Sequence, residues 1–169
     1  MATSATLKIG TIVGESVGVG SKPPKPHAGE INVLSWSWGL AQPASGHSGT
    51  TGAGTGKADV KDLTITKLVD CASPTLIAEC FKGSNQKEAV LSVFKATGGD
   101  EPLLFIKITL GDAKGGNVFI SSVQTGDPLP GDQYSETVTL NFSQVKFEYT
   151  AQNPDHTAGK TTVGEFVIS

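Results

Sequence analysis

Two glycine-rich segments have spacings that are typical of catalytic or nucleotide-binding loops. Residues 14–18 read GESVG and match the GxSxG pattern, in which a strand–turn–helix bend exposes a nucleophilic serine. Three prolines within residues 23–26 exclude the helix that this bend requires. Residues 52–58 read GAGTGKA, but a phosphate-binding loop needs glycine at Thr51 and a hydroxyl at Ala58. Neither segment is therefore interpreted as a site for chemistry.

Histidines and cysteines are few and widely spaced. His27, His47 and His156 are the only histidines and each has loop-forming neighbours, so we expect them to be solvated. Cys71 and Cys80 are nine residues apart, which does not fit the tight spacing of a structural metal site. We expect two reduced, partly buried thiols.

Neighbouring carboxylates could serve as metal ligands or as acid–base pairs. Asp59 and Asp62 form one such pair, and Asp100 and Glu101 form another. Acidic residues on strands and turns more often keep a sheet edge soluble, and this is the interpretation we favour. The sequence thus assigns no catalytic, cofactor-binding or metal-binding residue, and it predicts neither an enzyme nor a cofactor.

The composition limits the class of protein further. The 169 residues include 21 Gly and no Arg, only 17% are charged, and the net charge is −3. A dedicated nucleic-acid-binding protein would have a basic stripe, so that class is excluded. No apolar run reaches the roughly 18 residues of a membrane helix, and no signal peptide is visible. We expect a single domain over residues 1–169.

Alternating apolar residues predict mostly β-strands. One helix is predicted, with Ser73 as N-cap, Pro74 in the first turn and Gly83 at the C-terminal cap. The pattern predicts a mainly β fold, an antiparallel β-barrel or sandwich with one short α-helix packed against its side. The expected strands cover residues 6–13, 30–38, 59–66, 87–96, 103–110, 118–123, 136–142, 145–149 and 161–168.

Two regions are candidates for contacts with other molecules. Trp36 and Trp38 project from one face of a strand, as core residues or as a stacking platform for a sugar or a neighbouring subunit, and we favour the core. The region at about 41–58 is a low-complexity segment that we expect to be a long flexible loop, either a mobile linker without contacts or a segment that orders against a partner. Its candidate contact residues are Ala44, Ser45, Gly46, His47, Ser48, Gly49, Thr50, Thr51, Gly52, Ala53, Gly54, Thr55, Gly56 and Lys57.

The order of motifs along the chain resembles that of the haemolysin-coregulated proteins (Hcp), the tube subunits of bacterial type VI secretion systems. The resemblance starts with GES at 14–16 and HxxEIxVxSWSWG at 27–39. It continues through VKDLTITK at 60–67 and DCASPTL at 70–76, and then LLFIKI at 103–108 and ExVxLxFxxV at 136–145. It covers most of the chain in order.

This resemblance implies a β-barrel flanked by a helix, assembled as a homohexameric ring that stacks into a hollow tube. It also implies contractile sheath proteins, a spike protein and effector proteins in the lumen as partners. The subunit would be in the bacterial cytoplasm during assembly and then be secreted without a signal peptide. A ring needs a heterologous interface between different faces of neighbouring copies. The leading hypothesis is therefore a structural tube subunit, and the alternative is a secreted carbohydrate-binding β-sandwich.

Overall fold

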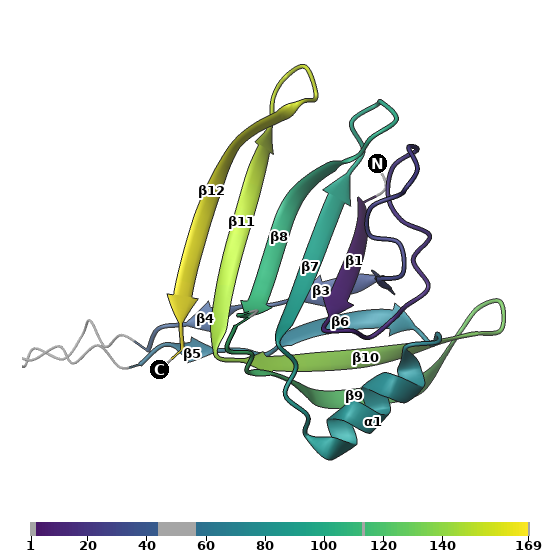
Figure 1. Ribbon diagram of the computed structural model, residues 1–169, viewed down its shortest axis with the longest axis vertical. Coiled ribbons are helices and arrows are strands. Elements are labelled where there is room, and N and C mark those ends of the chain that lie inside the picture. Colours follow the sequence, from purple (N-terminus) through teal and green to yellow (C-terminus); the bar gives the residue numbers. More distant parts are fainter. Residues whose placement is uncertain (1–2, 44–56, 113, 169) are drawn as a thin grey trace, which may run out of the picture.

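The computed structural model describes residues 3–43, 57–112 and 114–168 (Figure 1). Twelve strands and one helix follow one another in these residues. Their bounds are β1 (Thr3–Ile9), β2 (Ile31–Val33), β3 (Ser35–Ser37), β4 (Leu40–Ala41), β5 (Asp59–Val60), β6 (Leu63–Leu68), α1 (Ser73–Lys82), β7 (Glu88–Lys95), β8 (Leu103–Gly111), β9 (Val118–Leu129), β10 (Gln133–Phe142), β11 (Gln144–Gln152) and β12 (Ala158–Val167).

The strands form two main sheets and one small ribbon, all antiparallel. The larger sheet has six strands in the order β12-β11-β8-β7-β1-β2, and the smaller has four in the order β3-β6-β10-β9. The ribbon consists of β4 and β5. The strands of the four-stranded sheet cross those of the six-stranded sheet near one end, at the bottom of Figure 1. The mainly β class with one short helix is confirmed, and the described strands form separate sheets rather than one closed ring.

The core lies between the two sheets, because each strand alternates apolar and polar residues and places the apolar ones inward. In β6, for example, Leu63 and Ile65 are fully buried while Thr64 lies half-exposed on the other face. The main apolar residues of this core are Leu7, Ile9, Ile31, Leu63, Ile65, Leu76, Leu91, Ile108, Leu110, Val118, Val138, Leu140 and Val145.

The strand expected over residues 30–38 is divided between the two sheets. β2 pairs with β1, whereas β3 pairs with β6, and Leu34 lies at the corner between them. The amide of Leu34 donates to the carbonyl of Thr66, 2.8 Å away, so the chain leaves one sheet and enters the other within a single residue. The inward positions shift by one residue at this corner, from Ile31 and Val33 to Trp36 and Trp38, a break that the prediction of a single strand overlooked.

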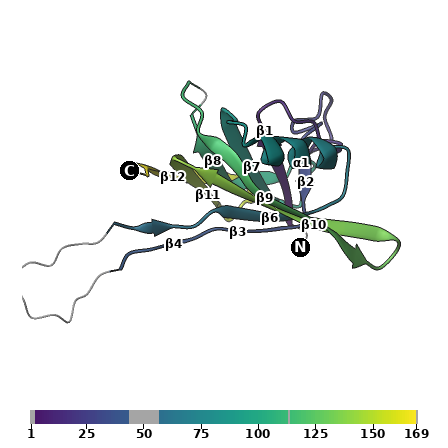
Figure 2. The same cartoon turned by 90° about the horizontal axis from the view of Figure 1, so that it is seen from below.

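The helix is confirmed at its C-terminal end and corrected at its start. Gly83 adopts φ = 63°, the left-handed conformation expected of a glycine cap. The N-cap is Ala72 and not Ser73, and no side chain caps the first turn. Ser73 is instead the first helical residue, and its buried hydroxyl donates to Glu136, 2.6 Å away. Helix α1 packs beside β9 (Figure 2).

Candidate assembly surfaces

The GESVG segment forms part of a loop that is folded onto β2. The Ser16 hydroxyl is buried and accepts a hydrogen bond from the amide of Gly18 at 3.1 Å, and its own amide donates to the carbonyl of Glu30. Residues 17–29 contain turns and bends but no helix. The serine therefore secures the loop and is not presented as a nucleophile.

The histidine prediction is wrong for His27. Its Nδ1 lies 3.0 Å from Glu30 Oε2, which also accepts a hydrogen bond from the Thr6 hydroxyl at 2.6 Å. The imidazole packs edge-on against Phe94, and the side chain is only 23% exposed. His27 thus ties the 14–30 loop to β1 and β7. His156 is exposed as expected, and His47 lies outside the described residues.

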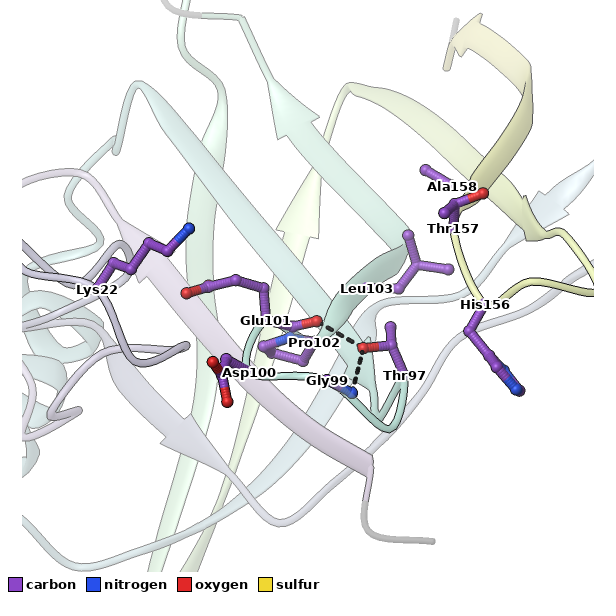
Figure 3. Close-up of a pocket in the computed structure, with 10 residues that line it drawn as sticks. All are labelled: Lys22, Thr97, Gly99, Asp100, Glu101, Pro102, Leu103, His156, Thr157 and Ala158. Atoms are coloured by element: carbon purple, nitrogen blue, oxygen red, sulfur yellow. Dashed lines mark hydrogen bonds between the residues drawn. The ribbon is translucent and has the colours of Figure 1, made fainter.

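A shallow hollow at one end of the six-stranded sheet collects several polar residues from three loops (Figure 3). Thr97 Oγ1 donates to the carbonyl of Glu101 and accepts from the amide of Gly99, so the hydroxyl stabilises its own loop. His156 points away from the carboxylates of Asp100 and Glu101 (Figure 3). No hydrogen bond joins His156 to Asp100 or Glu101 in the described structure, so these residues do not form an acid–base pair.

The two thiols differ in their surroundings. Cys71 is exposed, contrary to the expectation, whereas Cys80 is half-buried, and both are free. Partial desolvation and the nearby carboxylates of Glu15 and Asp70 raise the pKa of the Cys71 thiol, so it stays protonated near neutral pH. Among the described residues, no group of three or more His, Cys, Asp and Glu side chains could hold a metal ion. No helix in this part of the chain is long and apolar enough to cross a membrane.

The β4–β5 ribbon projects from the body as an arm (Figure 2). Trp38 lies at its base, where the indole Nε1 donates to the carbonyl of Lys61 at 3.0 Å. Its ring stacks on Phe147 and Phe166 at centroid distances of 6.5 and 6.1 Å, and it also contacts Phe142. Trp36 and Trp38 are both half-buried against the core, as the sequence predicts. The arm is therefore anchored at its root to strands β10, β11 and β12.

The candidate contact loop follows this arm. Residues 44–56 lie outside the described part of the chain, and Lys57 is exposed where the arm returns. The loop contact predicted from the sequence therefore stays a prediction.

The outward face of the four-stranded sheet is a lattice of uncharged polar side chains, which we call the hydroxyl face. It alternates with the buried apolar residues of β6 and β10. Ser121, at a bulge in β9, donates to Asp62 at 2.7 Å at the margin of this face. The hydroxyl face consists of two rows across the sheet, Ser37, Thr64, Thr139 and Ser122 in one and Ser35, Thr66, Thr137 and Gln124 in the other.

The core side of the same sheet carries a buried ion pair that the sequence analysis missed. Lys67 and Glu136 are cross-strand neighbours with fully buried side chains, and the Lys67 ammonium bonds both the Glu136 carboxylate and Asp70, the latter at 2.8 Å. Burial alone would raise the pKa of Glu136, but hydrogen bonds from Lys67 and Ser73 outweigh it and hold the pKa below its usual range. The signal was the alternation itself, because Lys67 follows Leu63 and Ile65 in the inward positions of β6.

The outward face of the six-stranded sheet is charged instead. Lys107 lies opposite Glu148, and Lys146 lies opposite Glu165, so opposite charges alternate over β8, β11 and β12. Lys146 Nζ is 3.6 Å from Glu148 Oε1. We call this surface the charged face.

This fold and its surfaces have clear relatives among proteins of bacterial secretion. The sequence profile described as "Type VI secretion system effector, Hcp" matches residues 6–149. The chain therefore belongs to the Hcp family, the effector and tube proteins of type VI secretion systems. It is 41% identical over 155 residues to Protein hcp1 of Pseudomonas aeruginosa, an alignment that covers 92% of this chain and 88% of that protein.

Solved structures agree with the family. The crystal structure of Hcp1 from Salmonella typhimurium has a TM-score of 0.74 at 32% identity, with 99% of this chain and 96% of that chain covered. A type VI secretion system effector from Yersinia pestis gives 0.70 at 25% identity, with 97% and 99% covered. The resemblance found in the sequence motifs is thus confirmed at the level of the family and the mainly β fold.

Proposed function

We propose that the chain is a structural, non-enzymatic tube subunit whose copies form six-membered rings that stack into a hollow tube. The observation that carries this proposal is the difference between two sides of the molecule. The β4–β5 arm projects from one side and the β9–β10 hairpin from the opposite side (Figure 2). A head-to-tail ring needs two different faces that can meet in neighbouring copies, and this shape offers them.

The hydroxyl face is the surface we assign to the lumen. Its eight side chains are uncharged and mostly short, so a passing protein would meet hydrogen-bonding groups without strong attraction or repulsion. Effector proteins would be carried against this wall. A contractile sheath and a spike protein are the other proposed partners, and the ring would assemble in the bacterial cytoplasm before its release.

Native mass spectrometry with negative-stain imaging tests the assembly. We expect a species of six subunits and ring-shaped particles. A monomer whose tryptophan fluorescence responds to sugars would support a carbohydrate-binding module and contradict the tube. The stacking of Trp38 on Phe147 and Phe166 favours the tube, because an indole that already packs on two phenylalanines has little free surface for a sugar.

Deletion of Ser48–Gly56 tests the predicted loop contact. We propose that residues 44–57 contact the adjacent or stacked ring, so the deletion should leave the sheets folded by circular dichroism and reduce tube formation. The control is a variant in which the same nine residues are replaced by a Gly-Ser linker of equal length, so that the sequence changes and the loop length does not. Unchanged stacking in the deletion variant would contradict the assignment.

A further inference from the structure

The core-facing side of the six-stranded sheet extends beyond the layer that covers it. The inward row of β11 loses burial from Val145 to Tyr149, and the facing residues of the edge strand β12 are exposed. Val145 is fully buried, Phe147 is half-buried and Tyr149 is 43% exposed, and Phe166 on β12 is 36% exposed. The registered rows across β8, β11 and β12 are Leu110, Val145 and Phe166, then Ile108, Phe147 and Gly164, then Ile106, Tyr149 and Thr162.

We call the uncovered part of this face the shelf, formed by Phe147, Tyr149, Gly164 and Phe166. Its three aromatic side chains stand in the same cross-strand rows as the core residues Ile108, Leu110 and Val145 or continue them. Two of them, Phe147 and Phe166, already stack on Trp38, which closes the shelf on the side of the arm. The shelf is therefore an apolar sheet face that no layer among the described residues covers.

Gly164 has no role that the described chain explains. It lies inside β12 without a positive φ, and a Cβ placed there would meet no atom within 4 Å. Glycine in the interior of a strand weakens it and often marks a place where another backbone approaches closely. Because Gly164 has no side chain, it leaves room over the apolar shelf, and we interpret this as space for a segment of another molecule.

The core-facing side of the four-stranded sheet also extends past the sheet opposite it, and we call each such uncovered part, this one and the shelf, an overhang. Along β10 the even-numbered residues face the core, since Glu136 and Val138 are fully buried. Tyr134 continues this row but lies beyond the six-stranded sheet and is 53% exposed, with Pro128 opposite it on β9. This hairpin tip, residues 126–134, lies on the opposite side of the molecule from β12 (Figure 1).

We propose that the hairpin tip of one copy covers the shelf of the next copy, with Tyr134 packed over Gly164 between Phe147 and Phe166. The inference deepens the proposed ring and rests on it. Each overhang lacks the layer that the other supplies, and the two lie on opposite sides of one chain, so the partner is a second copy of this chain. In a closed ring, the hairpin tip of each copy would cover the shelf of the next copy, so that no shelf stays exposed.

Paired substitutions at the two overhangs test the contact. Gly164→Val fills the shelf, and Tyr134→Ser removes the aromatic ring. We expect each to raise the concentration at which rings dissociate by about tenfold or more, the scale of a buried tyrosine at an interface. The matched controls are Val163→Ile and Gln133→Ser, whose side chains point to the opposite faces of the same strands, and they should change it by less than about threefold. Circular dichroism confirms that each variant is folded.

Cross-linking supplies an independent measurement. In a background of Cys71→Ser and Cys80→Ser, the double variant Gln133→Cys with Thr162→Cys, which keeps both Tyr134 and Gly164, is treated with a bismaleimide. We expect covalent oligomers of up to six chains, and the single variants should give none beyond dimers. Rings of the double cysteine variant without such a ladder, or rings that Gly164→Val and Tyr134→Ser leave intact, would overturn the proposed contact but not the proposed ring. A monomeric wild type would overturn the proposed function itself.

Discussion

The two sheets place their charges on opposite sides. The six-stranded sheet is apolar inside and carries alternating lysines and glutamates outside, such as Lys107 opposite Glu148. The four-stranded sheet is neutral outside and has its ion pair inside, between Lys67 and Glu136. The first arrangement is the ordinary one for a sheet that faces water. The second leaves the outward face of the four-stranded sheet polar but uncharged, which is consistent with the proposed lumen wall.

Burial makes the two sets of charges unequal in energy. A buried charge without its partner is strongly destabilising, whereas an exposed pair contributes little because water and salt screen it. The comparison therefore predicts large effects of substitutions on the inner side of the four-stranded sheet and small ones on the charged face.

The largest effect is expected for Lys67→Met. This change leaves Glu136 buried without its cation, and we expect the free energy of unfolding to fall by about 3–5 kcal/mol. Urea denaturation followed by circular dichroism measures it. The double variant Lys67→Met with Glu136→Leu should recover much of the loss, because a well-packed apolar pair can replace a buried ion pair. Equal losses in the single and double variants would show that the pair itself is not the cause.

Acid should weaken the protein through the same pair. The pKa of Glu136 is lowered in the folded state, so its contribution to stability is fully present above the unfolded pKa of about 4.3. That contribution is lost as the pH falls through the lower, folded-state value. Thermal unfolding between pH 7 and pH 3 should show a steeper decline below about pH 4 for the wild type than for the double apolar variant. Parallel curves would contradict the assignment.

A charge on the hydroxyl face should matter more to the assembly than to the single chain. Thr139→Lys places an ammonium among hydroxyls, and we expect stability to change by about 1 kcal/mol or less. Six such lysines around one lumen would repel one another, so ring formation should become dependent on salt concentration. Native mass spectra over a range of ionic strength measure this, with Thr139→Gln as the neutral control.

The smallest effect is expected on the charged face. Lys146→Ala removes an ammonium that lies 3.6 Å from Glu148, and the loss should be about 0.5 kcal/mol or less. High salt should reduce even that difference. A loss comparable to that of Lys67→Met would erase the distinction between the two sheets.

The sequence predicts the elements of this fold better than their assembly into sheets. The strand at residues 136–142 and the glycine cap at Gly83 follow from local alternation and backbone geometry. The corner at Leu34 shows in the sequence only as a one-residue shift of the inward positions, and its hydrogen bond to Thr66, 32 residues away, follows from no local pattern. Ser73 was expected to cap the helix, but its hydroxyl bonds Glu136 on β10, a partner that no local pattern specifies.

The same limit applies to the candidate surfaces. Family motifs identify the tube protein family, and alternation correctly places Trp36 and Trp38 against the core. The shelf could not be predicted, since Gly164 and Tyr149 read as ordinary strand residues, and only the tertiary structure shows that no other described residue covers them. Exposure of an inward-facing row depends on how far one sheet extends past the other, and that is a property of the tertiary structure.

The pairing of strands that lie far apart in the sequence, in both sheets, also governs the speed of folding. β1 pairs with β7 over its whole length, with Thr3 opposite Lys95, and the Lys67–Glu136 pair joins residues 69 positions apart. Such pairings close long loops before they gain any contact energy, and β proteins dominated by them fold in milliseconds to seconds. During synthesis, β1 can therefore pair only with the short strand β2 until β7 is made, and its inward Leu7 and Ile9 are covered only when the four-stranded sheet has formed.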